Sequence, residues 1–220
     1  MRRAPGQIDS VMPIAGKFIT FEGGEGAGKS TQLTRLSARL QSQGSVVLGL
    51  REPGGTIFGE KMREVLKHPE SAIRPAAEAL LFAACRAQLV AEVIVPALAE
   101  GKVVLCDRFI DSTVAYQSGG RGLDRGLIES ANALACGPLR PHLTVLLDLD
   151  PTRGLGRASI RDQGNADRFE ILGAEFHQKV RALYHALAKE EPARFFVVDA
   201  ARPPEVIEEE IWNEVARRFR

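Results

Sequence analysis

The sequence contains few cysteines, and they lie far apart. Cys85, Cys106 and Cys136 are its three cysteines, and each has apolar neighbours. The chain has no CxxC pair and no group of cysteines at metal-ligand spacing, which excludes a disulfide framework and a cysteine-based metal site. We therefore expect three buried free thiols in a reducing compartment.

The chain also lacks an excess of charge of either sign. It has 29 lysines and arginines against 28 aspartates and glutamates, a net charge of +1. This balance argues against a general nucleic-acid or membrane-surface binder. Apolar residues make up 45% and charged residues 26%, which is ordinary for a soluble globular protein.

Long apolar runs are missing as well. Residues 1–15 contain no run of signal-peptide length, and no stretch approaches the roughly 18 apolar residues of a membrane-spanning helix. We expect a cytoplasmic protein in which residues 1–15 are a disordered extension and residues 16–220 form a single domain. Either Met1 or Met12 is its first residue.

Short β-branched runs alternate with longer helical patterns. Strands are expected at residues 17–22, 46–51, 102–107, 143–149 and 195–199, and helices at 29–43, 60–67, 75–99, 125–135 and 204–218. Strands that are apolar on both faces and separated by helices favour an α/β fold with a parallel sheet covered on each side. The helix 75–99, bent or ended near Pro96, is so apolar that it is buried either against a second subunit or in the centre of a monomer.

A glycine-rich turn follows the first expected strand. Residues 23–30, GGEGAGKS, fit G-x-x-x-x-G-K-[ST] between a strand and a helix. Such a loop turns its backbone N–H groups toward phosphate oxygens, with Lys29 reaching the outer phosphates and the Ser30 hydroxyl available to Mg²⁺. The predicted ATP-binding residues are Gly23, Gly24, Glu25, Gly26, Ala27, Gly28, Lys29, Ser30 and Thr31. The alternative is a glycine turn without a ligand. No NKxD-like motif is present, so ATP is favoured over GTP.

Arginines indicate a second anion site. Arg51 and Arg108 follow expected strands, and Arg86 lies on the long helix. Because the carboxyl ends of parallel strands meet at one edge of a sheet, these side chains are expected to converge near the phosphate loop. Arginine forks suit a phosphate held in fixed orientation, although each arginine alone could form a surface ion pair. Asp107, at the end of its strand, suits Mg²⁺ as the carboxylate counterpart of Ser30.

With these motifs the chain resembles the bacterial-type thymidylate kinases, which are P-loop nucleoside monophosphate kinases. The matching segments are FEGGEGAGKST, LREPGGT, AEALLFAACRAQLV, VVLCDRFIDSTVAYQSGGRGLD, LTVLLDLDP and DRFE at 167–170. The resemblance extends from about Gly16 to the C-terminus. It implies transfer of the γ-phosphoryl group of ATP to dTMP, a three-layer P-loop NTPase fold with a five-stranded parallel sheet, and an arginine-bearing lid over about residues 153–170.

The resemblance also implies a dTMP site. Its residues would be Glu25, Arg51, Phe82, Arg86, Arg108, Thr113, Tyr116 and Gln117. The two phosphate-binding residues are Arg51 and Arg108, and the ring stacking on thymine is Phe82. The residues at the base edge are Arg86, Thr113 and Gln117. By the same resemblance, Tyr116 would lie under the deoxyribose and Glu25 would reach its 3′-hydroxyl. From the residues alone, Phe82 and Tyr116 could pack in the core, Thr113 could cap a helix, Gln117 could support a turn and Glu25 could be solvated.

The lid carries a stripe of arginines. Arg153, Arg157 and Arg161 recur every four residues, Arg168 follows, and DQGNAD interrupts the helix. The alternative is a solvated basic face. In the family the catalytic arginine comes from the phosphate loop or the lid, and this loop has none, so Arg157 and Arg161 are the candidates. Ser159 stands where other members carry a further arginine. The predicted catalytic set is Lys29, Asp107, Arg108, Arg157 and Arg161.

The expected ligands are ATP, dTMP and Mg²⁺, and the resemblance implies a homodimer through the helix at 75–99. Neither nucleic acid nor membrane is expected as a partner. Two other functions remain open: a kinase for another nucleoside monophosphate or a deoxynucleoside, and a P-loop ATPase that acts as a switch.

Overall fold

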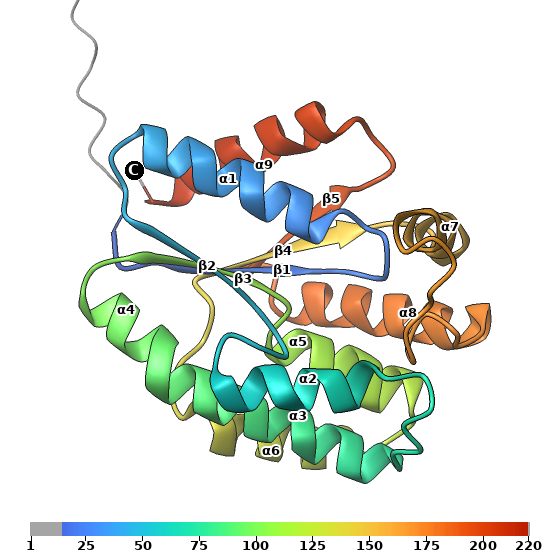
Figure 1. Ribbon diagram of the computed structural model, residues 1–220. Coiled ribbons are helices and arrows are strands. Elements are labelled where there is room, and N and C mark those ends of the chain that lie inside the picture. The colour runs from blue at the N-terminus through green and yellow to red at the C-terminus, as the bar shows by residue number, and fades with distance from the viewer. Residues whose placement is uncertain (1–14, 220) are drawn as a thin grey trace, which may run out of the picture.

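The computed structural model describes residues 15–219, and a parallel sheet lies at its centre (Figure 1). Within these residues the sheet has five strands in the order β2-β3-β1-β4-β5. The strands are β1 (Phe18–Glu22), β2 (Val47–Arg51), β3 (Val103–Asp107), β4 (Leu143–Asp148) and β5 (Phe195–Asp199). Every residue of the central strand β1 is buried, as a strand covered on both faces requires. The predicted five-stranded parallel sheet is confirmed.

Helices cover both faces of the sheet and give three layers (Figure 1). Helices α1 (Lys29–Ser42) and α9 (Pro204–Phe219) lie on one face. The other helices are α2 (Ile57–Lys67), α3 (Pro75–Leu89), α4 (Val95–Ala99), α5 (Ile110–Thr113), α6 (Arg125–Cys136), α7 (Pro151–Arg161) and α8 (Ala174–Glu190). Of these, α3, α4, α6 and α8 lie on the opposite side of the sheet from α1, whereas α7 lies beyond the strand ends.

Successive residues of β1 point to opposite faces of the sheet and pack in two different halves of the core. Ile19 and Phe21 pack with Leu40 of α1 and Ile211 of α9, whereas Phe18 packs on the α3 side. Because side chains alternate along a strand, Glu22 points to the same side as Phe18. The end of β1 therefore places the Glu22 carboxylate in the layer that contains α5 and α8.

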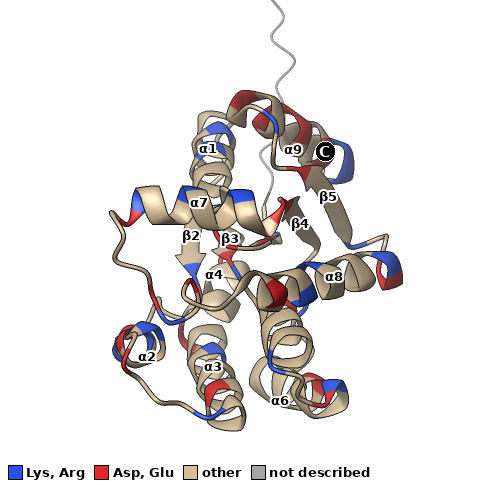
Figure 2. Ribbon diagram, turned by 90° about the vertical axis from the view of Figure 1, so that its right-hand side faces the viewer, with Lys and Arg blue, Asp and Glu red and all other residues tan. Residues whose placement is uncertain are grey.

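The loops that carry the sequence motifs meet at one edge of the sheet. In the register of the strands, Arg51 lies opposite Asp107 and Asp107 lies opposite Phe21. The phosphate loop after β1, the turn after β2 and the segment after β3 all leave from this edge, as expected for parallel strands. Figure 2 looks onto this edge, with α7 lying across the strand ends.

Most expected elements agree with the structure to within one residue at each end. Helix α2 begins three residues earlier than expected, at Ile57, because Thr56 accepts a hydrogen bond from the Gly59 N–H at 2.9 Å and caps the helix. Helix α8 was not expected at all. The expected extension, residues 1–15, lies outside the described residues except for Ala15, and so does Met12.

The helix expected at 75–99 is continuous but irregular. A π-helical turn, Val90–Ile94, joins α3 to α4, and Pro96 stands in the first turn of α4 rather than ending the helix. One side of the helix covers the sheet, but Leu80 is 64% exposed and Val95 49%. The helix therefore does not lie in the centre of the monomer.

The same helix bears on the expectation that no stretch of the chain spans a membrane. Pro75–Ala99 has a mean hydropathy of 1.6 over its most apolar window and is, by length and composition alone, apolar enough to cross a membrane. It nevertheless buries Glu78 and Arg86 in ion pairs within the protein. These contacts fit a helix that packs against the rest of the protein.

The three cysteines agree with expectation. All are free and buried, and burial raises the pKa of both the Cys85 and the Cys136 thiol to about 11. They are therefore protonated and unreactive at neutral pH.

Candidate active site

The phosphate loop connects β1 to α1. Gly26 and Gly28 have φ values of 63° and 92°, which favour glycine. The Lys29 ammonium donates hydrogen bonds to the carbonyl oxygens of Gly23 (3.1 Å) and Gly24 (2.7 Å). Burial and the nearby charge of Arg108 lower the pKa of Lys29 to about 8, so it still carries its charge at pH 7. The positive N-terminal end of α1 lies at the same loop.

The phosphate loop also touches α7, the helix that carries the predicted lid arginines. A Cβ atom on Gly26 would lie 2.0 Å from the Gly154 carbonyl oxygen, and one on Gly154 would lie 2.3 Å from the Glu25 carbonyl oxygen. Two glycines therefore let the backbones of the loop and α7 approach directly. This contact fixes the first turn of α7 on the loop.

Ser30 and Asp107 form a possible metal site beside the loop. The Ser30 hydroxyl donates to Asp107 Oδ2 at 2.5 Å. A hydroxyl and one carboxylate suit Mg²⁺, which is usually bound through one or two carboxylates together with waters and substrate phosphates. Among residues 15–219 no group of three or more His, Cys, Asp or Glu residues could hold a metal ion by itself. The donors present therefore fit a metal that arrives with a nucleotide.

Arg108 is held between the phosphate loop and the segment after β3. Its φ is 71°, an unfavourable backbone conformation for a residue other than glycine and one that is concentrated at functional sites. Its guanidinium donates to the Gly23 carbonyl oxygen at 3.2 Å and to Ser112 Oγ at 3.2 Å. It also donates to Glu25 at 2.7 Å and to the Tyr116 hydroxyl at 3.1 Å.

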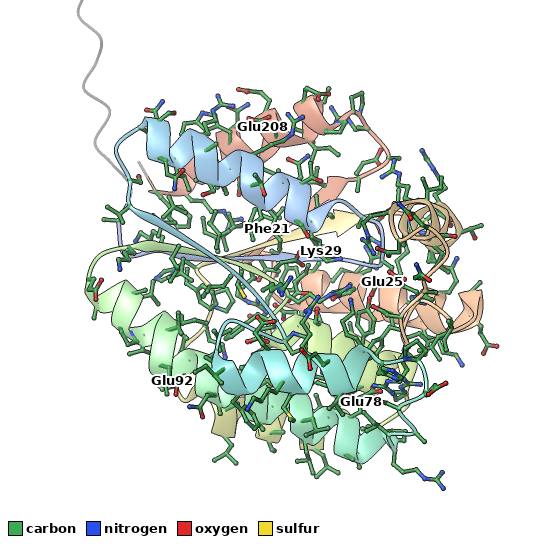
Figure 3. All side chains as sticks on the ribbon, viewed as in Figure 1. Phe21, Glu25, Lys29, Glu78, Glu92 and Glu208 are labelled. Carbon is green, nitrogen blue, oxygen red and sulfur yellow. The ribbon has the colours of Figure 1, made fainter. Side chains whose placement is uncertain are left out.

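Glu25 faces Arg108 and Tyr116, and Figure 3 shows it at the same edge of the sheet as Lys29. Its carboxylate accepts from Arg108 and, at 2.8 Å, from the Tyr116 hydroxyl. Burial acts to raise the pKa of Glu25, but the charges of Arg108 and Lys29 outweigh it and lower the pKa to about 2. Glu25 is therefore ionised at neutral pH. It is hydrogen-bonded to Arg108 and Tyr116, unlike the solvated residue that the sequence left open.

Glu22 holds in place the segment that follows Arg108. It accepts hydrogen bonds from the Phe109 N–H (2.7 Å), Ser112 Oγ (2.5 Å) and the Tyr184 hydroxyl (2.8 Å). Burial and the charge of Asp111 raise the pKa of Glu22 to about 7. The carboxyl group fixes the start of the segment 109–112, and with it the position of Arg108.

One cavity of about 530 Å³ joins the phosphate loop to the segment after β3. The predicted site residues that line it are Glu25, Gly26, Ala27, Gly28, Lys29, Ser30, Thr31, Arg51, Phe82, Arg86, Asp107, Arg108, Thr113, Tyr116, Gln117, Arg157 and Arg161. Gly23 and Gly24 belong to the phosphate loop but lie outside this lining and border a small hollow beneath the loop instead.

The far end of the cavity is formed by α3 and the segment 113–117. Arg86 is buried there, donating from Nε to Glu52 (2.8 Å) and from Nη1 to Asn132 (2.8 Å). Thr113 and Gln117 are almost fully buried, at 2% and 1% exposure. Polar groups held at fixed positions in a cavity wall fix the orientation of a bound ligand.

The arginines of the expected acceptor and lid sites differ in the ion pairs and hydrogen bonds that hold them. Arg51 is exposed and paired with Glu60 at 3.1 Å. On α7, Arg157 donates to the Ala200 carbonyl oxygen at 3.1 Å, and Arg161 pairs with Asp162 and with Glu170.

Arg153 and Arg168 do not line the cavity, although Arg153 lies on α7 with Arg157 and Arg161. Arg168 is buried, and its Nε donates to the Leu66 carbonyl oxygen at 2.9 Å. Of the four arginines between residues 153 and 168, Arg157 and Arg161 therefore lie on the cavity wall.

The cavity contains residues that sequence reasoning did not assign. These are Glu52, Pro53, Arg63, Lys67, Ser112, Asp162, Asp167 and Phe169. The Phe169 ring lies 5.9 Å from Phe82 and 6.0 Å from Tyr116, centroid to centroid. The DRFE segment contained the signal for Asp167 and Phe169. Arg63 and Lys67 lie four residues apart on α2. No motif marks them as site residues, and only the packing of α2 brings them to the cavity.

The fold and the cavity together identify the class of protein. A parallel sheet in this order, a phosphate loop between β1 and α1, and an arginine-containing cavity beside it are those of a P-loop nucleotide kinase with adjoining donor and acceptor sites.

Comparison with known proteins narrows the class. A family model described as thymidylate kinase matches residues 21–211. A thymidylate kinase of Solidesulfovibrio magneticus is 53% identical over 206 residues, which cover 91% of this chain and 99% of that protein. One from Deinococcus radiodurans is 53% identical over 203 residues, covering 92% and 98%. The crystal structure of thymidylate kinase from Ehrlichia chaffeensis is similar with a TM-score of 0.74 and 32% identity, covering 90% and 97%. The chain belongs to the thymidylate kinase family, and the predicted P-loop NTPase fold is confirmed.

Proposed function

We propose that the chain transfers the γ-phosphoryl group of ATP to dTMP, giving dTDP and ADP. The observation that carries this proposal is the single cavity that runs from Lys29 and Ser30 to Phe82 and Gln117. Such a cavity gives a triphosphate and a second nucleotide one common space. Residues 16–220 would act as one kinase domain, with a lid over about 153–170, in the cytoplasm.

The donor half is the phosphate loop. The loop N–H groups and Lys29 would bind the ATP phosphates. Ser30 and Asp107 would hold Mg²⁺, which would supply positive charge to offset that of the phosphates. Arg157 and Arg161 on the lid helix would neutralise the charge that develops on the transferred group.

The acceptor half lies beyond Arg108. Arg51 and Arg108 would bind the 5′-phosphate, and Phe82 would stack on thymine. Tyr116 would pack beneath the deoxyribose, and Glu25 would accept a hydrogen bond from its 3′-hydroxyl. Support for Glu25 comes from its contacts, since it already faces Arg108 and Tyr116 on the acceptor side. Arg86, Thr113 and Gln117 would meet the base edge.

The reaction would be an in-line displacement. An oxygen of the acceptor phosphate forms the new bond to the γ-phosphorus while the bond from that phosphorus to the β-phosphate oxygen breaks. That nucleophile is already anionic near pH 7, so no strong base is required. Positioning and positive charge from Lys29, Arg108 and the lid arginines carry the catalysis.

A homodimer through the helix at 75–99 is part of the proposal. Leu80 and Val95 on that helix are large apolar side chains, 64% and 49% exposed, and a second copy would cover them. Light scattering should find a dimer at working concentration, and Leu80→Asp should shift it toward monomer. A protein that is monomeric without any substitution contradicts this part of the proposal.

The test is an acceptor panel. ATP consumption is measured with dTMP, dUMP, UMP, CMP and thymidine, and with no acceptor. A strong preference for dTMP is expected. A preference for another acceptor would reassign the base site, and slow hydrolysis that no acceptor stimulates would indicate an ATPase switch. Arg108→Met should remove the stimulation by dTMP, while Glu129→Gln, at an exposed ion pair on α6, should leave it unchanged.

A further inference from the structure

Glu78, in the first turn of α3, is a charged group that the proposed reaction does not use. It is fully buried, does not line the cavity, and lies on the α3 side of the molecule (Figure 3). A buried carboxylate is costly unless charges and hydrogen bonds compensate it. Here the compensation comes from three side chains of two other segments. Those side chains show what the carboxylate holds in place.

The first of them is Gln117, which lines the cavity. Its amide nitrogen donates to Glu78 Oε1 at 2.8 Å. An ionised carboxylate only accepts hydrogen bonds, so it selects the amide orientation in which the nitrogen faces Glu78. The carbonyl oxygen of Gln117 is then the polar end left for the cavity. Glu78 thereby sets which half of the amide a ligand meets.

The other two are arginines that flank the cavity wall. Arg121, just after the segment that carries Gln117, donates to Glu78 from Nε at 3.1 Å and from Nη2 at 2.9 Å. Arg168 lies 2.6 Å from Glu78 Oε2, and its backbone N–H donates to the Lys67 carbonyl oxygen at 3.1 Å. Arg168 is next to Phe169, whose ring contacts Phe82. One carboxylate therefore fixes both the amide and the aromatic wall beside it.

Arg121 and Arg168 also hold the Glu78 carboxylate in place, because both guanidinium groups converge on it and offset the cost of burying its charge. The orientation of Gln117 thus depends on Glu78 and, through it, on Arg121 and Arg168.

We propose that Glu78 is a positioning residue that selects the base of the acceptor: it presents the Gln117 carbonyl oxygen to the base edge, so that the site favours a pyrimidine with a hydrogen on N3, thymine or uracil, over cytosine. Cytosine carries no hydrogen on N3 and would meet an acceptor with an acceptor. The proposal rests on the proposed function, which puts the base beside Gln117.

The experiment measures kcat/KM for dTMP, dUMP and dCMP in the full-length enzyme and in Glu78→Gln. The neutral amide at position 78 can pair with either end of Gln117, so the preference for dTMP over dCMP should fall about tenfold, the worth of one net hydrogen bond. The dTMP to dUMP ratio should stay constant, since these bases share the N3 hydrogen. Glu129→Gln removes a carboxylate from an exposed pair on α6 and should change neither ratio.

A double-mutant cycle separates positioning from support of the fold. In Gln117→Ala the preference should already be reduced, and adding Glu78→Gln should change it no further. Equal losses of kcat/KM for dTMP and dCMP in Glu78→Gln would show support of the fold only and overturn the proposal. If Glu78→Gln does not fold, Glu78→Asp, which keeps the charge but draws the carboxylate away from Gln117, should show the same fall in preference; an unchanged ratio there also overturns it.

The result distinguishes this proposal from the proposed function. If the unsubstituted enzyme does not phosphorylate dTMP, the proposed function fails and the selection argument falls with it. If the enzyme phosphorylates dTMP and discriminates against dCMP, but Glu78→Gln retains that discrimination, only the role of Glu78 is wrong.

Discussion

Removal of the Glu25 carboxylate should weaken the acceptor site and spare the donor site. Glu25 lies within the phosphate loop, yet its two side-chain hydrogen bonds go to Arg108 at 2.7 Å and to the Tyr116 hydroxyl at 2.8 Å. Both partners lie in the half of the cavity where the acceptor is proposed to bind. In Glu25→Ala, Arg108 loses the carboxylate that orients its guanidinium, and under the proposed function the acceptor sugar would lose a hydrogen-bond acceptor.

The size of the effect follows from the kind of bond that is lost. A hydrogen bond to a charged group contributes about 1.5–3 kcal/mol, which corresponds to about 10- to 150-fold in an equilibrium constant. We therefore expect the KM for dTMP to rise about 10- to 150-fold in Glu25→Ala, with the KM for ATP changed by no more than about twofold. Glu25→Gln keeps an acceptor for Tyr116 but not the charge, so its KM for dTMP should be intermediate.

Steady-state kinetics with each substrate varied in turn measure both constants. The reasoning fails if Glu25→Ala raises the KM for ATP as much as that for dTMP, because the carboxylate would then act on the whole loop. It also fails if the KM for dTMP is unchanged, because Glu25 would then be a loop residue without a role in the acceptor site.

Three further predictions concern the lid and the buried carboxyl group. Arg157→Ala and Arg161→Ala should lower kcat by orders of magnitude, with modest change in KM for ATP, since an arginine at the transferred group is worth about 10³–10⁵ in rate; near-normal kcat in both would refute the lid assignment. Gly154→Ala should lower kcat and the melting temperature, because its Cβ would lie 2.3 Å from the Glu25 carbonyl oxygen, whereas Gly156→Ala, with open space around the added Cβ, should be tolerated. The raised pKa of Glu22, from its ordinary 4.5 to about 7, means that the folded protein holds a proton which the unfolded chain has released. The free energy of unfolding should therefore fall by on the order of 3 kcal/mol as pH rises from 4.5 through 7. Denaturant unfolding across this range should show a smaller fall in Glu22→Gln, and equal slopes would contradict the argument.

Local pattern predicted the sheet and the phosphate loop well. The strand runs are short and β-branched, and GGEGAGKS stands in the one context, after a strand and before a helix, in which it binds phosphate. Helix α8 was missed although its buried residues His177, Val180, Tyr184 and Leu187 recur at intervals of three and four. The signal was therefore present in the sequence.

The parts of the site that sequence could not give depend on contacts between distant segments. Arg86 is held by Glu52 and Asn132, which lie 34 and 46 residues away. Glu78 reads from the sequence as one charge near the start of an apolar helix. Only the fold brings Gln117 to it, 39 residues along the chain. Residue types and motif spacing identify candidates, whereas packing decides which polar groups meet.

The acceptor panel tests the central claim most directly. With purified protein, ATP and Mg²⁺, the rate of ADP formation is compared for dTMP, dUMP, UMP, CMP and thymidine against the rate without acceptor. The structure and the family predict a large stimulation by dTMP and a weaker response to the other acceptors. An equal rate with and without dTMP would contradict a two-substrate site in this cavity.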